Sequence, residues 1–253
     1  SIAAACTKKA YLVMSAADLA PTLVEAFQIA REGRPGPVLV DVPRDVQLEE
    51  AEFEFYPAAP EPAPPLTPET LELIEQAARL INEAQRPLII GGHGILTSGA
   101  TKELKDLAEN TGIPVITTLL GLGAFPGNHP QNLGMLGMHG MYWANMAVDQ
   151  ADLLVGLGMR FDDRVTGRVS TFAPHARIIH LDIEASQLGR NVPVEVPLVG
   201  DAKPILQSLV PLVKRVERPG WLAHIDKLRQ DHPSLSIPPS DSLLPQHVLT
   251  SLN

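Results

Sequence analysis

Short apolar runs of strand length alternate with amphipathic stretches through the middle of the chain. The four clearest runs, rich in Val, Ile and Leu, cover residues 87–90, 114–117, 152–155 and 177–181. Continuous apolar runs of this length are typical of strands buried on both faces, as in a parallel sheet between helices. A further run at 194–199 contains Pro197, which a central strand does not tolerate, so we expect an edge strand there.

Helical periodicity fills the intervals between these runs. Apolar residues recur every three or four positions over residues 67–84, 100–110, 141–150 and 202–213. Thr67 and Pro68 give the first helix a cap and a proline at its first position. The alternation predicts an α/β fold with a doubly wound, Rossmann-like, mainly parallel sheet of six strands, over residues 66–214.

The two ends of the chain have a different pattern. A helix at 17–31 and a strand at 37–41 indicate the last part of one domain, residues 1–48. Six prolines between 57 and 68 favour extended structure, so residues 49–65 are predicted to be a linker. We expect a second linker at 215–240, with a helix at 221–230, and the first helix of a further domain at 241–253.

Composition narrows the class of protein. Hydrophobic residues make up 45% and charged residues 19% of the 253, which is typical of a compact α/β protein. A net charge of −9 without a basic stripe argues against a nucleic-acid partner. The single cysteine, Cys6, can form neither an internal disulfide nor a cysteine metal cage. Because no apolar run approaches the roughly 20 residues that cross a bilayer, we expect an intracellular protein without a membrane partner.

The densest cluster of charges follows the strand at 152–155. Residues 156–167 read GLGMRFDDRVTG, and four of five consecutive positions are charged: Arg160, Asp162, Asp163 and Arg164. Open α/β sheets bind ligands at the carboxyl ends of their strands. Arginine beside glycine suits a polyanion, because the guanidinium group grips phosphate with two hydrogen bonds. The alternative is a solvated turn held by its own ion pairs.

Glycine-rich segments adjoin the other predicted strands. Residues 91–94 supply two glycines of a dinucleotide-binding fingerprint, but Thr97 stands where the third belongs, so a tight strand-to-helix turn explains them equally well. Residues 117–123 follow the next strand, and residues 133–140 precede the next helix. We expect these loops to line one crevice.

Two aspartates at predicted strand ends have two interpretations each. Asp182 could accept hydrogen bonds from a ribose or cap a helix at 184–188. Asp201 presents the same choice. The sequence contains no G-x-S-x-G, Walker or H-E-x-x-H motif, which excludes the common hydrolase, nucleotidase and zinc-protease classes.

Soft side chains accompany the glycine loops. Met135, Met138 and Met141 either fill the core or contact a flat aromatic ring. His139 is expected to be a structural histidine that offers its backbone to a ligand.

Four segments together resemble the catalytic subunit of acetohydroxyacid synthase (acetolactate synthase), a thiamine-diphosphate enzyme family. They are GRPGPVLVDVPRD at 33–45, LGMHG at 136–140, GMRFDDRVTG at 158–167 and HLDI at 180–183. The first is shared loosely by many thiamine-diphosphate enzymes, whereas RFDDRVTG is more particular to this family. The resemblance, which runs nearly end to end, implies a pyrimidine-binding, a central FAD-binding and a pyrophosphate-binding domain in that order.

The resemblance also implies site residues. FAD would be contacted by Arg34, Gly91, Gly92, Thr118, Leu119, Leu136, Gly137, Met138, His139, Gly158, Met159, Arg160, Phe161, Asp162, Asp182, Ile183, Asp201 and Ala202. Arg164 would help to select the second 2-oxoacid substrate, with Asp163 and Met138 beside it.

The implied reaction is decarboxylation of pyruvate on thiamine diphosphate, followed by addition to a second pyruvate or to 2-oxobutanoate, in branched-chain amino-acid biosynthesis. FAD would perform no net redox chemistry. The groups that hold thiamine diphosphate and Mg²⁺ belong to parts of the family outside these 253 residues. We therefore expect no catalytic or metal-binding residue here, and no full reaction from this chain alone.

The family implies a homodimer or homotetramer, a possible small regulatory subunit, and a bacterial cytoplasm, plastid or mitochondrion as location. Two features depart from it: residues 2–7 look like an insertion, and Arg44 stands where many relatives have lysine. The alternatives are a pyruvate oxidase or glyoxylate carboligase, a noncatalytic nucleotide-binding module, and an NAD-binding deacetylase-like domain.

Overall fold

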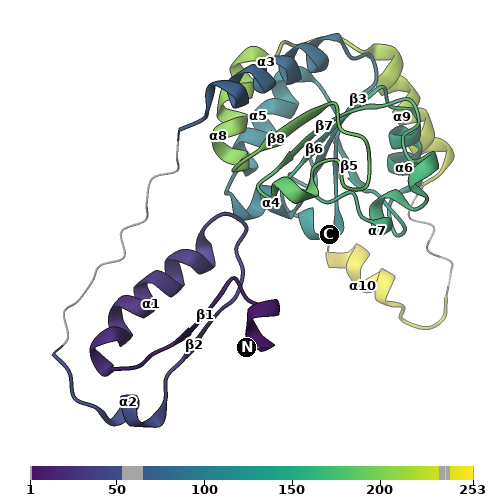
Figure 1. Ribbon diagram of the computed structural model, residues 1–253. Helices are drawn as coiled ribbons and strands as arrows, with labels where there is room; N and C mark the ends of the chain where they lie inside the picture. Colours follow the sequence, from purple (N-terminus) through teal and green to yellow (C-terminus); the bar gives the residue numbers. More distant parts are fainter. Residues whose placement is uncertain (1, 53–64, 234–236, 238–239, 253) are drawn as a thin grey trace. The chain divides into compact units, whose positions relative to one another are not determined.

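A computed structural model describes residues 2–52, 65–233, 237 and 240–252. The chain separates into two units, Ser1–Thr67 and Pro68–Asn253 (Figure 1). Most of the linker predicted at 49–65 lies outside the described residues. Within the described parts, no helix has both the length and the apolar character needed to span a membrane.

The first unit is built around two parallel strands joined by a helix. Its elements are η1 Ile2–Ala5, β1 Lys9–Leu12, α1 Ala16–Arg31, β2 Val38–Asp41 and α2 Arg44–Leu48. The predicted helix and strand are confirmed to within one residue. Strand β1 was not predicted, although its last three residues begin the short apolar run AYLVM at 10–14.

The second unit contains a six-stranded sheet. Its strands are β3 Pro87–Gly91, β4 Val115–Thr117, β5 Asn132–Met135, β6 Leu153–Leu157, β7 Arg177–Asp182 and β8 Val196–Val199. The α-helices are α3 Pro68–Glu83, α4 His93–Thr97, α5 Thr101–Thr111, α6 Tyr142–Gln150, α7 Asp163–Thr166, α8 Ala202–Leu209, α9 Pro219–Asp231 and α10 Pro245–Leu252. Short 3-10 turns are η2 Leu119–Gly121, η3 Val169–Thr171, η4 Ala185–Gln187 and η5 Val210–Leu212.

The strand order decides where this unit can bind a ligand. Every pairing in the sheet is parallel, and the order is β5-β4-β3-β6-β7-β8. This is the order of dinucleotide-binding folds, so the predicted six-stranded Rossmann-like sheet is confirmed. The order reverses between β3 and β6, whose last residues, Gly91 and Leu157, lie side by side. Connections leaving these two strands pass to opposite faces, which places a crevice at their carboxyl ends.

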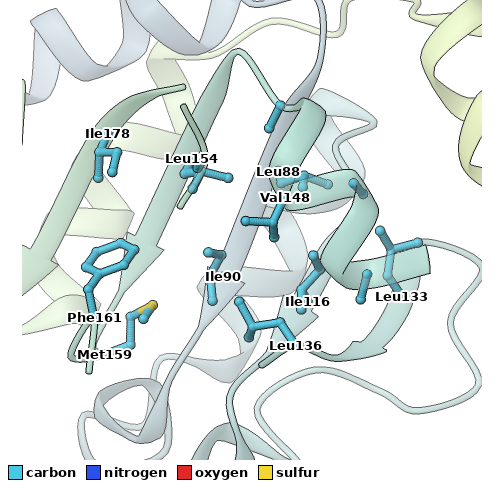
Figure 2. Close-up of a cluster of buried hydrophobic side chains, with 14 of the residues drawn as sticks. Leu88, Ile90, Ile116, Leu133, Leu136, Val148, Leu154, Met159, Phe161 and Ile178 are labelled. Carbon is cyan, nitrogen blue, oxygen red and sulfur yellow. The ribbon is translucent and has the colours of Figure 1, made fainter. Parts of the chain in front are cut away.

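Helices cover both faces of the sheet: α6 and α9 lie on one, and α3, α5 and α8 on the other (Figure 1). Leu88, Ile90 and Leu154 point to the first face, where they contact the cluster around Val148 of α6 (Figure 2). Every residue of β3 and β6 is buried. This explains the continuous apolar runs in the sequence, since neither face of these strands meets water.

Three elements differ from the sequence prediction. Strand β5 was expected to be a loop, because Gly134 interrupts its apolar residues in the sequence. In the structure this strand is irregular: Gly134 has φ +82°, and the pairing with β4 shifts register. The helix predicted at 202–213 ends as an α-helix at Leu209, since Pro211 has no N–H to continue the ladder. The helix predicted at 221–230, within a linker expected at 215–240, is confirmed as α9, but this helix contributes Trp221 and Ile225 to the core.

Arg218, just before α9, joins the ends of two helices. Its side chain is buried and donates to the carbonyls of Ile81 (2.9 Å), Ala84 (2.8 Å) and Thr111 (3.1 Å), at the C-termini of α3 and α5. A cation at this position complements the helix dipoles and satisfies carbonyls that have no partner within their helices. Burial lowers the pKa of Arg218, but a guanidinium group stays charged in proteins.

Arg218→Met removes these donors while keeping an unbranched stem. We expect the free energy of unfolding to fall by about 2–4 kcal/mol, because each buried carbonyl left unsatisfied costs about 1–3 kcal/mol. Urea denaturation followed by tryptophan fluorescence measures this, since both tryptophans, Trp143 and Trp221, belong to the second unit. Arg215→Met is the control, because its exposed pair with Glu217 should contribute under about 1 kcal/mol. Equal losses in the two variants would contradict the capping role.

Candidate functional site

The site residues predicted in the second unit gather at the carboxyl edge of the sheet. They end five strands or come directly after them: Gly91 ends β3 and Gly92 follows it, Thr118 follows β4, Leu136–His139 follow β5, Gly158–Asp162 follow β6, and Asp182 ends β7 with Ile183 after it. Asp201 and Ala202 follow β8. Arg34 belongs to the first unit, where it is exposed between α1 and β2.

Glycines allow the loops after β3 and β6 to touch backbone to backbone. A Cβ on Gly92 would lie 2.2 Å from the carbonyl oxygen of Gly158, and one on Gly94 would lie 2.6 Å from the Cα of Gly158. The amide of Gly94 donates to the carbonyl of Gly158 at 2.9 Å. These glycines are therefore required by the contact between two loops, and that contact fixes where the next residues, 158–162, leave β6.

Residues 158–162, here called the arginine turn, send alternate side chains inward and outward. Met159 and Phe161 are 4% and 3% exposed and extend the core cluster beside Ile178 (Figure 2). Arg160, between them, has 52% of its side chain exposed. Its nearest carboxylate oxygen, on Asp162, is 3.9 Å away, so the guanidinium group remains open to a ligand.

Two side chains hold the backbone of the arginine turn from below. The Nε2 of His180 donates to the carbonyl of Met159 at 2.7 Å, and the Nδ2 of Asn191 donates to the carbonyl of Phe161 at 2.8 Å. Burial lowers the pKa of His180, although the Met159 carbonyl and the charge of Asp182 oppose this, so the ring is neutral at pH 7. The sequence did not single out either residue for this contact, although a histidine inside the apolar run at 177–181 was a usable signal.

The residues assigned to substrate selection come together beside this turn. Asp162 caps α7 by accepting from the amide of Arg164 (3.2 Å), which starts the helix that carries Asp163 and Arg164. The guanidinium group of Arg164 lies 3.1 Å from Asp163 and 3.6 Å from the sulfur of Met138. The amide of Met138 also donates to the carbonyl of Arg164, so the loops after β5 and β6 are joined here.

The loop after β5 is fixed by a residue that the sequence did not indicate. Asn145 of α6 accepts from the amide of Gly137 (2.8 Å) and donates to its carbonyl (3.0 Å). Leu136 is buried, whereas Met138 and His139 are exposed. Leu136 can therefore offer a ligand only backbone atoms, while Met138 can offer a side chain.

The loop after β4 presents apolar side chains to solvent. Thr118 caps η2, since its Oγ1 accepts from the amide of Gly121 at 3.1 Å. Leu119 is 64% exposed at the start of that turn. Leu119 and Met138 follow the paired strands β4 and β5, and exposed apolar side chains of this kind suit contact with a flat ring.

Both aspartates with two interpretations use one oxygen locally. Asp182 accepts from the amide of Glu184 at 2.9 Å, and Asp201 accepts from the amide of Lys203 at 2.9 Å as the cap of α8. Each keeps a second carboxylate oxygen and is partly exposed. The capping interpretation is confirmed for Asp201, whereas the cap of η4 after β7 is Glu184 and not Asp182. Both aspartates keep an acceptor for a ligand hydroxyl.

These residues fit a flavin dinucleotide. An open arginine suits the diphosphate, a carboxylate oxygen at a strand end suits a ribose, and exposed Leu119 and Met138 suit the ring system. A cavity of about 400 Å³ lies nearby, lined by Thr117, Leu122 and Trp143 among others, and none of the predicted flavin contacts lines it. The candidate site is thus the open edge of the sheet.

Comparison with known proteins identifies the family. Residues 74–209, more than half of the chain and all within the second unit, match the family described as "Thiamine pyrophosphate enzyme, central domain". The chain belongs to the thiamine pyrophosphate enzyme family. The six-stranded parallel sheet is therefore the central domain of such an enzyme.

Within this family the chain is similar to acetolactate synthases. It is 43% identical to acetolactate synthase from Mycobacterium leprae over 97% of this chain and 41% of the relative, and 44% identical to the large subunit from Corynebacterium glutamicum over 98% and 41%. A probable large subunit from Methanocaldococcus jannaschii is 45% identical over 93% and 40%. These matches confirm the resemblance seen in the sequence. The chain spans about two fifths of the length of these relatives.

Gly158→Ala tests the contact between the loops of this thiamine pyrophosphate enzyme. At φ +59°, the new Cβ would lie 2.6 Å from the Cα of Gly94 and 2.9 Å from its carbonyl carbon. We expect the free energy of unfolding to fall by about 3–4 kcal/mol, because overpacking adds to the cost of a left-handed alanine. The control is Gly189→Ala, at φ +69° with open space around it, which should cost only about 1–2 kcal/mol. Urea denaturation that gives the same loss for both would refute the contact as the reason for Gly158.

Proposed function

We propose that this chain is the FAD-binding central part of the catalytic subunit of an acetolactate synthase. Such an enzyme decarboxylates pyruvate and joins the remaining two-carbon unit to a second pyruvate or to 2-oxobutanoate. The observation that carries the proposal is the arginine turn, which directs Arg160 to the carboxyl edge of the sheet at the point where the strand order reverses. The similarity to acetolactate synthases over nearly the whole chain supports the same function.

The residues of this chain bind and orient FAD in the proposed site. Arg160 pairs with the diphosphate, and the second oxygen of Asp182 accepts from a ribose hydroxyl. Backbone groups of Leu136 and Met159, whose side chains are buried, complete the contacts, while Leu119 covers the ring. FAD supplies no net redox chemistry to this reaction. Thiamine diphosphate and Mg²⁺ belong to the complete enzyme, and we assign them no residue of this chain.

Arg164, Asp163 and Met138 form the proposed contact with the second 2-oxoacid. The Arg164 guanidinium group can bind the substrate carboxylate, since its pair with Asp163 is exposed and therefore weak. The sulfur of Met138 lies beside the same guanidinium group and can contact the alkyl part of the substrate, where pyruvate and 2-oxobutanoate differ by one methylene. The homodimer or homotetramer, the regulatory subunit and the cellular compartment stay predictions.

Titration with FAD tests the cofactor assignment. We expect the purified chain with FAD to show the two-band absorbance of a bound oxidised flavin, and Arg160→Ala to weaken binding by about 1–3 kcal/mol through loss of a charge-assisted contact. Fluorescence quenching of FAD gives the dissociation constant. Arg168→Ala, an exposed arginine in the next turn of chain, is the matched control and should leave that constant unchanged.

Two results would contradict the assignment. A chain that leaves FAD free in solution would contradict the proposed cofactor and favour a different nucleotide-binding module. An Arg160→Ala variant with the dissociation constant of the Arg168→Ala control would remove Arg160 from the site while leaving the cofactor in place.

The substrate assignment needs a polypeptide extended to the full length of the acetolactate synthases that the chain resembles. In that protein, we expect Arg164→Ala to lose the preference for 2-oxobutanoate over pyruvate by about tenfold while FAD stays bound. The variant removes the side chain that contacts the sulfur of Met138, beside the methylene by which the two substrates differ, and one methylene is worth about tenfold or more in discrimination. Competition between the two substrates, with both products quantified, measures the preference. An unchanged product ratio would show that selection lies elsewhere.

A further inference from the structure

His180 is enclosed beneath the arginine turn. The residue is 1% exposed and lies on β7 directly opposite Gly156 of β6. Gly156 has no side chain, and a Cβ there would lie 2.9 Å from the ring of Phe161, so that ring covers the strand at this point. The Phe161 ring meets the His180 ring edge-on, with centroids 4.9 Å apart. The histidine is thus surrounded by two strands and by the turn that folds back over them.

The ring makes one hydrogen bond. A carbonyl oxygen can only accept, so the 2.7 Å contact with Met159 places the proton of the neutral ring on Nε2. Nδ1 is then an acceptor, and it has no hydrogen-bond partner among the described residues, although it is buried. His180 therefore donates one hydrogen bond, from Nε2, while its other ring nitrogen, Nδ1, is buried without a partner among the described residues.

Packing alone does not account for a histidine at this place. An apolar side chain of similar size would fill the same space without burying an unpaired nitrogen, which is costly in a protein interior. Ile178, two residues earlier on the same face of β7, is apolar, as expected for a position with only a packing role. What His180 adds is a donor aimed at the Met159 carbonyl.

That carbonyl belongs to the peptide group that leads directly into Arg160. Phe161 is the residue after Arg160, and its carbonyl accepts from the side chain of Asn191. The backbone on both sides of the exposed arginine is thus held by buried or partly buried side chains. Movement of the Met159 carbonyl would shift the Cα from which the guanidinium group extends.

We propose that His180 is a positioning residue, which fixes the direction of Arg160 through its hydrogen bond to the Met159 carbonyl. The connection to FAD rests on the function proposed above, whereas the hold on the turn does not. The two parts can therefore be tested separately.

A matched pair of variants isolates the donor. His180→Gln keeps an N–H at the same number of bonds from the backbone as Nε2, and His180→Met has a similar length without a donor. Ile178→Val is the control for a small loss of packing on the same strand and face. Amide hydrogen exchange of the FAD-free chain, read at residues 158–164, reports the hold on the turn.

In His180→Met, we expect residues 158–164 to exchange about tenfold faster than in the wild type, the upper range for loss of one neutral hydrogen bond. His180→Gln and Ile178→Val should stay within about threefold of the wild type there. The dissociation constant of FAD should rise about tenfold in His180→Met and be restored in His180→Gln. Wild-type exchange in His180→Met, or equal acceleration in the Gln and Met variants, would overturn the proposal.

Two further outcomes are informative. If His180→Met does not fold, His180→Asn replaces it, because its amide is one bond too short to reach the Met159 carbonyl. Faster exchange in the Asn variant than in the Gln variant then supports the positioning role, and equal exchange overturns it. If the turn loosens as expected but the wild type binds no FAD, His180 positions Arg160 and the proposed cofactor is wrong.

Discussion

The candidate site depends on a place where two loops touch without side chains between them. Gly92 and Gly94 after β3 meet Gly158 after β6 so closely that a Cβ on any of the three would overlap backbone atoms. The contact lies where the strand order reverses, between the two central strands of the sheet. Because it fixes the start of the arginine turn, it also fixes the position of the charges that follow. The three glycines are thus needed for the packing of the two loops, and a ligand can bind at this edge only if that packing is in place.

The arginine turn belongs to the core and to the surface at once. Met159 and Phe161 continue the hydrophobic cluster, while Arg160 and the residues that begin α7 meet solvent. The sequence left two readings of these charges: a ligand site, or a turn held by its own ion pairs. Both pairs exist, at 3.9 Å and 3.1 Å, but their partners are 40% to 73% exposed. Exposed pairs contribute little, so an anion can replace them at small cost.

The sequence predicted those parts of the fold that local chemistry determines. Strands β3, β4, β6 and β7 could be located because both faces are buried, which leaves a continuous apolar run. Strand β5 could not, since Gly134 and a shifted register interrupt its pattern. In the candidate site, the charged residues and glycines in the sequence were enough to predict which loops are involved. The side chains that hold those loops in place were not predicted. Asn145 and Asn191 act across 8 and 30 residues of sequence, and such contacts follow from tertiary structure alone.

Helix α9 changes where this domain ends. Its Trp221 and Ile225 lie in the core against the α6 face, and Arg218 just before it satisfies the ends of α3 and α5. The sheet itself is complete at β8, and composition alone suggests a boundary near residue 214. A fragment cut there would expose the apolar face of α6 and leave two helix termini uncapped. Any attempt to express this central domain by itself should therefore retain the chain through Asp231.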